Sequence, residues 1–260
     1  MAEARRLSHA LTRHLPAVAV LCAVALVWEF FTKITGEPAY ILPPVSAIVR
    51  TCATLAADVL IPAAAVTLEE MLLGFVLGVG VGILLAVLLF QFALVRRSLL
   101  PIIIASQAIP VIAIAPIFIL WFGFGVAPKV LMAALISFFP VVINTLAGLE
   151  TVEADSVNLM RSLGASGRQI FWKLRLPSAT PFMFAGIKNA AAISAIGAIV
   201  GEWVGASAGL GPVMIGANAA FKTATVFAAI FYLAAMAIAL FLLVGLLEKR
   251  TIRWYYLTRK

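Results

Sequence analysis

Charged residues are scarce in this chain of 260 residues. They make up only 12% of it, roughly half the share found in soluble domains, whereas 64% of the residues are hydrophobic. A soluble fold of this size could not bury so much apolar surface, and a large exposed apolar surface leads to aggregation. The composition therefore excludes an ordinary soluble protein and indicates one whose solvent is the lipid bilayer.

Cysteine and histidine are equally scarce, with two of each. Cys22 lies in an apolar run, and the two histidines are His9 and His14, so neither a disulfide framework nor a metal site is expected. The phosphate-binding pattern G-x-x-x-x-G-K-[ST] is also missing from the sequence. A membrane enzyme would need a nucleophile, a metal cluster or an acid–base pair, and no candidate has the required partners. We expect no enzymatic activity and no cofactor on this chain.

Long apolar runs, by contrast, are frequent. A helix that crosses a membrane needs ~20 mostly apolar residues. The first run could be a secretory signal peptide, but it continues into the bulky stretch VWEFF without a small-residue cleavage site, which favours a retained anchor. The sequence predicts an all-α polytopic membrane protein in one transmembrane domain of six helices, at residues 15–33, 70–92, 98–122, 128–149, 180–205 and 224–247.

The basic residues predict the orientation of these spans. With alternating spans, all Lys and Arg residues fall on the side of the N-terminus except Lys33, Arg50, Lys129, Lys188 and Lys222. Loops rich in Lys and Arg stay in the cytoplasm. Both termini and the loop 150–179 are therefore predicted to be cytoplasmic. This distribution explains the net charge of +8 without a nucleic-acid partner.

Proline and polar residues interrupt the third, fourth and fifth spans. Three prolines in the third span predict a kinked or locally opened helix, which membranes tolerate where protein or a water-filled cavity covers it. These positions suggest a transport pathway, although hydrogen bonds between packed helices would explain the same residues. The candidate pathway residues are Ser106, Gln107, Pro110, Asn144 and Asn189.

Two acidic residues, Glu29 and Glu202, lie in or near apolar spans. Carboxylates are costly in lipid and are therefore candidates for a functional role. Each is also next to a tryptophan and near the predicted outer end of its span, so an interfacial, solvated carboxylate is an equally good interpretation.

The loop 150–179 is a polar segment between apolar spans. It predicts one helix over about 156–163, a turn at Gly164 and Gly167, and a second helix over 168–174 that Leu176-Pro177 ends before the fifth span. Such a helix–turn–helix elbow could dock into a groove of a soluble partner. Alternatively, it could lie as an amphipathic loop on an anionic membrane surface.

The loop resembles the cytoplasmic loop of permease subunits of bacterial ATP-binding-cassette importers. Those subunits carry Glu-Ala-Ala, three residues, Gly, nine residues, Ile, any residue and Leu-Pro. Gly164 takes the glycine position, Leu174 the isoleucine position, and Leu176-Pro177 ends the motif, whereas Asn158-Leu159-Met160 replaces Glu-Ala-Ala. The stretches VWEF, LPPVSAI and GEWVGASAGLG and residues 109–152 are similar to the branch that imports sulfonates, taurine, nitrate, riboflavin or pyrimidine vitamin precursors.

The resemblance implies a homodimeric permease in the bacterial inner membrane. It would carry a small organic solute or anion that an external solute-binding protein delivers, and two separate ATPase subunits would bind ATP and Mg. A stand-alone secondary transporter or channel remains the alternative; it predicts coupling residues within the spans. The resemblance implies that the 156–177 loop couples to the ATPase through Arg161, Ser162, Leu163, Gly164, Ala165, Phe171, Leu174, Leu176 and Pro177.

Overall fold

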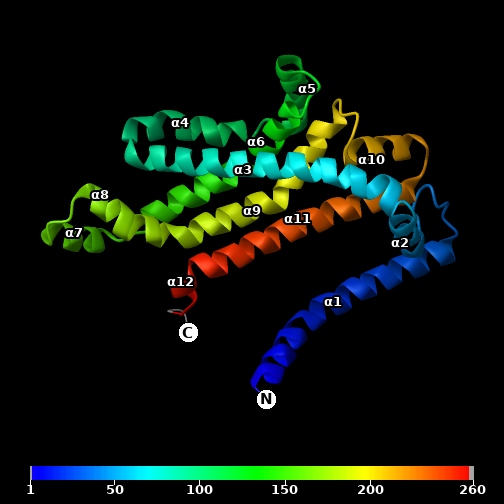
Figure 1. The fold of residues 1–260 in the computed structure, drawn as a ribbon, viewed down its shortest axis with the longest axis horizontal. Coiled ribbons are helices and arrows are strands. Elements are labelled where there is room, and N and C mark those ends of the chain that lie inside the picture. Colours follow the sequence, from blue (N-terminus) through cyan, green and yellow to red (C-terminus); the bar gives the residue numbers. More distant parts are fainter. Residues whose placement is uncertain (1, 258–260) are drawn as a thin grey trace. The chain divides into compact units, whose positions relative to one another are not determined.

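The computed structural model describes the backbone of residues 2–257 and the side chains of 15, 16 and 18–255; every regular element in this part of the chain is a helix (Figure 1). The chain forms two compact units. One contains the chain up to Ile61 together with Val213–Ile230, and the other contains Pro62–Pro212 and the chain from Phe231 onward. The basic side chains that entered the topology prediction but lie outside the described ones are Arg5, Arg6, Arg13, Arg259 and Lys260.

The first unit contains α1 (Ala2–Thr35), α2 (Val45–Thr54), a π-helical turn (Ala56–Leu60), most of α10 (Leu210–Ala219) and the start of α11 (Thr223–Thr251). Trp28 of α1 packs edge-on against Phe227 of α11, with 5.3 Å between ring centroids. Glu29 of α1 accepts hydrogen bonds from the backbone N–H and the hydroxyl of Ser46 at 3.0 and 2.8 Å. This carboxylate therefore caps the start of α2, where backbone N–H groups have no partner within the helix.

The second unit holds the remaining helices. Glycines let its central helix, α6, lie very close to α3 and α9. A methyl group added at Gly78 of α3 would lie 2.8 Å from the carbonyl oxygen of Ala134, and one at Gly186 of α9 would lie 2.7 Å from that of Pro140. Small residues at such crossings allow membrane helices to pack backbone to backbone. The helices of this unit are α3 (Ile61–Gln91), α4 (Ala93–Ser106), α5 (Val111–Phe122), α6 (Ala127–Glu150), α7 (Ala154–Ser162), α8 (Gly167–Ile170), α9 (Leu176–Trp203), the rest of α11, and α12 (Arg253–Leu257).

The apolar helices match the predicted fold class. Five helical stretches are long and apolar enough to cross a membrane, and α4 with α5 makes a sixth if the bent pair counts as one span. The prediction of an all-α polytopic membrane protein is confirmed. The five continuous stretches are Val18–Thr35, Ala56–Gln91, Ala127–Glu150, Gly167–Trp203 and Thr223–Thr251.

The second apolar helix begins earlier than the sequence predicted. The helical stretch starts at Ala56 rather than at residue 70. Thr67 and Glu70 lie near the predicted start of this helix, and both are buried and hydrogen-bonded to other helices. A polar side chain with a buried partner does not interrupt a membrane helix.

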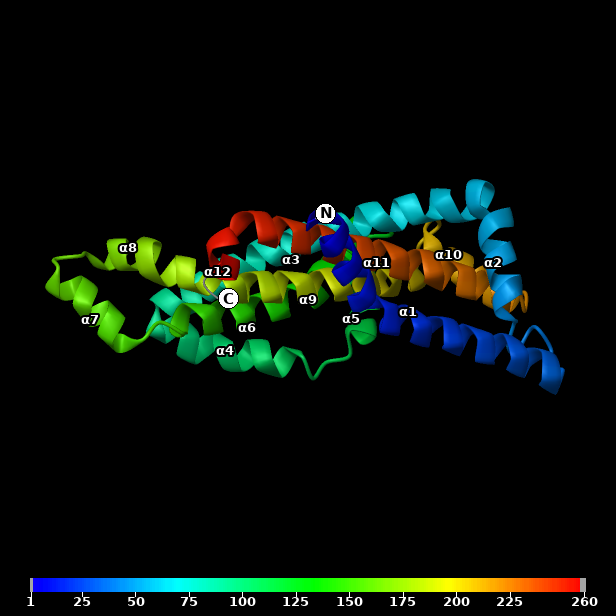
Figure 2. The ribbon, with the colours of Figure 1, turned by 90° about the horizontal axis from the view of Figure 1, so that it is seen from below.

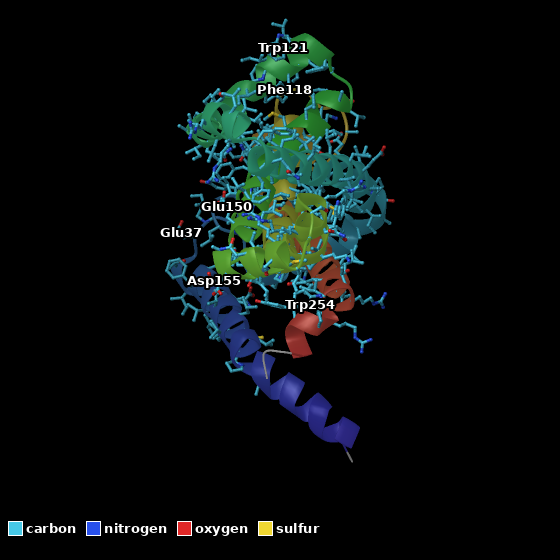
Figure 3. The ribbon with its side chains drawn as sticks, turned by 90° about the vertical axis from the view of Figure 1, so that its left-hand side faces the viewer. Glu37, Phe118, Trp121, Glu150, Asp155 and Trp254 are labelled. Carbon is cyan, nitrogen blue, oxygen red and sulfur yellow. The ribbon has the colours of Figure 1, made fainter. Side chains whose placement is uncertain are left out.

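Of the two alternatives predicted for the third span, a kink or a local opening, the structure has the opening. α4 ends at Ser106, α5 begins at Val111, and their axes differ by 105°. Pro110 has ψ 119°, an extended conformation, and proline cannot supply the N–H that a continuous helix needs. Figure 3 shows α5, which carries the labelled Phe118 and Trp121, standing out from the second unit.

The predicted helix end at Leu176-Pro177 is wrong. Residues 167–203 form one continuous helical stretch through this dipeptide. A π-helical turn at Phe171–Arg175 ends two residues before Pro177, and the Leu176 N–H bonds to the Phe171 carbonyl five residues back. Proline is also tolerated in the first turn of an α-helix, where its missing N–H is not needed. The second helix of the elbow and the fifth span are therefore one element.

Candidate functional site

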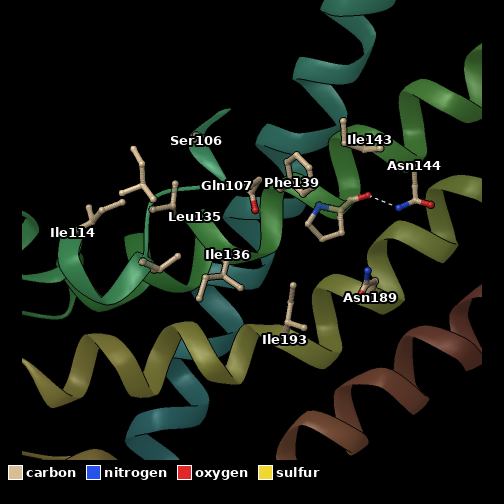
Figure 4. Close-up of a pocket in the computed structure, with 13 residues that line it drawn as sticks. Ser106, Gln107, Ile114, Leu135, Ile136, Phe139, Ile143, Asn144, Asn189 and Ile193 are labelled. Carbon is tan, nitrogen blue, oxygen red and sulfur yellow. Dashed lines mark hydrogen bonds between the residues drawn. The ribbon is translucent and has the colours of Figure 1, made fainter. Parts of the chain in front are cut away.

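A cavity of about 410 Å³ lies between the α4–α5 break, α6 and α9 (Figure 4). Among the predicted pathway residues, Ser106, Gln107, Asn144 and Asn189 line it, whereas Pro110 is not among the lining residues. The remaining lining residues are apolar or proline, and none of the lining residues carries a charge. The structure therefore brings together most of the candidate pathway residues, which are far apart in the sequence.

Hydrogen bonds occupy part of the polar surface of this cavity. The Asn144 side-chain amide donates to the Pro140 carbonyl at 2.7 Å, and the Ser106 hydroxyl donates to the Ile103 carbonyl at 2.7 Å. Both bonds stay within one helix, so they are not the interhelical bonds of the alternative interpretation. Gln107 and Asn189 are exposed, and their amides offer both donors and acceptors.

The elbow between α6 and α9 has a sharply defined turn. Gly164 has φ +79°, a left-handed conformation that glycine adopts without strain. Its N–H bonds to the Arg161 carbonyl at 2.9 Å, and the Ala165 N–H bonds to the Met160 carbonyl at 3.0 Å, which is the Schellman pattern of a helix end. The next helix starts at once, because Ser166 and Gln169 form a reciprocal capping box.

The base of the elbow is fixed to the rest of the second unit. The Arg175 guanidinium lies 4.7 Å above the centre of the Phe90 ring of α3 and donates to the Leu149 carbonyl of α6 at 3.2 Å. Phe171 packs near the same Phe90 ring, with 6.3 Å between centroids. Leu174, Leu176 and Pro177 are half-buried in this part.

The tip of the elbow is exposed, and it lies at one end of the second unit (Figure 2). The exposed fraction is 76% for Leu163 and 58% for Trp172. Arg161, Ser162 and Gly164 are also exposed, and Ala165 is half-buried. The elbow thus presents apolar and basic side chains together on a firmly anchored base.

Sequence reasoning missed a buried polar cluster at the other end of α6. Lys129 was counted only as a charge on the outer side, and its buried partner was not predicted; the solvated interpretation of Glu202 is wrong. Lys129 is buried and forms an ion pair with Glu70 of α3, with 2.8 Å between Nζ and Oε1. Glu202 is 1% exposed and hydrogen-bonded. The sequence feature that could have indicated this burial is the pair of glycines after Glu202. A side chain at Gly209 or Gly211 would collide with Glu202.

Taken together, these features define a membrane-embedded transport subunit: apolar spans around an uncharged cavity, with a helical elbow at one end. More particularly, the chain belongs to the family of binding-protein-dependent transport system inner membrane components, whose profile matches residues 78–253. It is thus the permease subunit of an ATP-binding-cassette importer and a multi-pass inner membrane protein.

Several relatives match along most of the chain. It is 37% identical to the formylaminopyrimidine transport permease protein ThiX of Halalkalibacterium halodurans, over 88% of this chain and 91% of the relative. It is 36% identical to the riboflavin transport system permease protein RibX of Chloroflexus aurantiacus, over 90% of this chain and 88% of the relative. The taurine transport system permease protein TauC of Escherichia coli is 29% identical, over 96% and 92%.

Among solved structures, the fold is similar to a chain of the MetNI methionine ABC transporter in an inward-facing conformation. The TM-score is 0.57 at 21% sequence identity, over 75% of this chain and 95% of that chain. This likeness shows that the two chains share a fold.

Proposed function

We propose that the cavity is part of the route of the solute and that the elbow transmits the motion of an ATPase to it. The observation that carries this proposal is the continuity of the helical stretch Gly167–Trp203, which joins the elbow to the cavity. Asn189 and Ile193 line the cavity from this stretch, and Trp172 is exposed near its other end. At 1.5 Å per residue, Trp172 and Asn189 are separated by about 25 Å of helix.

A continuous helix transmits displacement better than a loop does. An ATPase that binds the elbow differently in its two nucleotide states shifts the equilibrium of the permease by its difference in affinity. Because Arg175 and Phe171 hold the base of the elbow against α3 and α6, movement of the tip acts on the helices that line the cavity.

The lining of the cavity favours a neutral, hydrogen-bonding solute. Its polar groups are one hydroxyl and three side-chain amides, together with apolar residues. A nitrogen heterocycle can exchange hydrogen bonds with amides and stack on apolar walls. A sulfonate or nitrate is an anion and would bind best beside a cationic side chain. None of the lining residues is cationic, and the ammonium of Lys188, next to Asn189, is already paired with Glu248 at 2.6 Å. The names of the formylaminopyrimidine and riboflavin relatives agree with a heterocyclic substrate.

The assembly completes the proposal. Two copies of this chain form the pathway, ATPase subunits bind the two elbows from the cytoplasm, and a solute-binding protein docks on the outer side. Both termini are cytoplasmic in this arrangement. Family membership sets aside the stand-alone secondary transporter.

The test is a reconstituted complex. The chain is co-expressed with the ATPase and the solute-binding protein encoded beside it, purified in mild detergent and placed in lipid nanodiscs. We expect a stable complex whose ATP hydrolysis rises with the binding protein loaded with a pyrimidine or a flavin, relative to the empty binding protein. A rise with taurine or nitrate alone would contradict the proposed solute class. A chain that never retains the ATPase would contradict the role of the elbow.

A further inference from the structure

Three ionisable side chains meet inside the second unit, where α6 begins and α9 ends. Glu70 comes from α3, Lys129 from α6 and Glu202 from α9; their exposed fractions are 1%, 7% and 1%. They do not line the cavity between the α4–α5 break, α6 and α9. The proposed transport route and the elbow therefore leave this cluster unexplained.

Hydrogen bonds fix one half of the cluster. Glu202 accepts the Thr67 hydroxyl at 2.6 Å through Oε1 and the Gly211 backbone N–H at 2.5 Å through Oε2. The Leu210 N–H donates to the Thr67 hydroxyl oxygen at 2.9 Å. Leu210 and Gly211 are the first residues of α10. Glu202 and Thr67 thus cap α10, and a carboxylate at a helix N-terminus is stabilised by the helix dipole when it is ionised.

The other half has an unsatisfied atom. Oε1 of Glu70 accepts from the Lys129 ammonium at 2.8 Å. Oε2 of Glu70 is fully buried, and within the described part of the chain no group donates a hydrogen bond to it. The Glu202 carboxylate lies nearby, because Thr67, one turn from Glu70 on α3, donates its hydroxyl to Glu202. Two ionised carboxylates would therefore lie close together in a buried site, and such like charges favour protonation of one of the two.

The charge count leads to the same result. Among the described residues, the groups that donate hydrogen bonds to the two carboxylates are the Lys129 ammonium from α6, the Thr67 hydroxyl from α3 and the Gly211 N–H from α10. Only one of them is a full positive charge. Two ionised carboxylates would leave one buried negative charge without compensation, which is strongly unfavourable.

We propose that Glu70 and Glu202 form a proton-binding site, in which Oε2 of Glu70 carries the proton and donates it to the Glu202 carboxylate. The cluster is then neutral: a protonated Glu70, a cationic Lys129 and an anionic Glu202. This single proton gives Oε2 of Glu70 a hydrogen-bond partner and also makes the net charge of the cluster zero. The hydrogen bond of this proton links α3 to α9. The Lys129 ion pair adds α6 and the Glu202 cap adds α10, so four helices are joined at this end of the unit.

Infrared spectroscopy detects this proton directly. The purified importer complex is measured as wild type and as Glu70→Gln, and the difference spectrum is examined for the C=O stretch of a protonated carboxyl group. We expect a band that is present in the wild type, moves in deuterated buffer and is lost in Glu70→Gln. The matched control is Glu69→Gln, because Glu69 is the exposed neighbour on the same helix, and this substitution should leave the band of the buried carboxyl group in place. A wild type without a carboxyl band assigned to Glu70 would overturn the proposal.

Thermal unfolding gives an independent test, because glutamine imitates a protonated glutamate in shape and hydrogen bonding. We expect Glu70→Gln to melt at the wild-type temperature and Glu202→Gln to melt lower, because an amide cannot accept both hydrogen bonds of the α10 cap. If Glu70→Gln melts as low as Lys129→Met, then Glu70 is ionised and the proposal is wrong. These readouts need no transport activity, so they are independent of the solute and of the elbow.

Discussion

Lys188 of α9 and Glu248 of α11 form an ion pair with 2.6 Å between Nζ and Oε2. The exposed side-chain fraction is 27% for Lys188 and 8% for Glu248, so most of the pair is withdrawn from solvent. Both helices are apolar membrane-span candidates. Charged residues in such helices are tolerated when they pair with each other.

The first prediction concerns this pair. We expect Glu248→Gln to lower the free energy of unfolding by about 1–3 kcal/mol, because the Lys188 ammonium then lacks its counter-charge. The measurement is thermal unfolding in detergent. The double variant Lys188→Met/Glu248→Leu should recover most of the lost stability, because it removes both charges. A single variant as stable as the wild type would show that the pair contributes nothing.

The second prediction concerns the contact of α9 with α6. Gly186→Ala should destabilise the protein by about 1–3 kcal/mol, because the new methyl group would lie 2.7 Å from the Pro140 carbonyl oxygen and 2.9 Å from Asn144 Cβ. The matched control is Gly245→Ala in α11, where nothing lies within 4 Å of the added methyl group. The control should be neutral or up to about 1 kcal/mol more stable, as alanine is the better helix former. Equal effects of the two substitutions would contradict the close packing of α6 and α9.

The third prediction concerns the cap of α10. Thr67→Val removes a hydroxyl that donates to Glu202 and accepts from the Leu210 N–H. We expect a loss of about 1–3 kcal/mol, because buried partners are left without hydrogen bonds. Thr251→Val is the control, since the Thr251 hydroxyl bonds only to the Leu247 carbonyl of its own helix. A melting temperature that falls equally in both variants would argue against the cap.

The fourth prediction concerns the amides of the cavity. Asn189→Leu should reduce solute uptake about tenfold in proteoliposomes, if its amide contributes one hydrogen bond to the passing solute. Asn218→Leu makes the same change at an exposed position that does not line the cavity, and it should transport normally. Normal uptake by Asn189→Leu would remove this residue from the pathway.

Much of the fold could be predicted because hydropathy and proline act locally. The apolar runs predicted six spans, of which five are continuous helices and the sixth is the bent pair α4–α5, and the three prolines of the third span predicted a kink or an opening there. The glycine turn at Gly164 was also readable, since few residues adopt its positive φ. The selection of Ser106, Gln107, Asn144 and Asn189 rested on polar residues within apolar helices, and these four now line one cavity.

The remaining features depend on contacts between distant parts of the chain. Lys129 and Glu70 are each unremarkable in their local sequence, and only the packing of α3 against α6 pairs them. Thr67 is buried within the second helix for a similar reason, because it bonds to Glu202 of α9 and Leu210 of α10. The continuity at Pro177 depends on a π-helical turn, for which the local sequence has no clear pattern.

The most direct test of the account compares two glycines that both have a positive φ. Gly164 in the elbow has φ +79° and Gly123 after α5 has φ +76°, and at both positions nothing lies within 4 Å of an added methyl group. Both substitutions place the same long basic side chain at a glycine with positive φ. Gly123 also has ψ −171°, which strains a non-glycine residue strongly, so retention of the ATPase by Gly123→Arg would show that backbone strain alone does not release it. The measurement is the amount of ATPase that co-purifies with each variant. The account predicts that Gly164→Arg loses the ATPase while Gly123→Arg keeps it; full retention of the ATPase by Gly164→Arg would contradict the coupling role of the elbow.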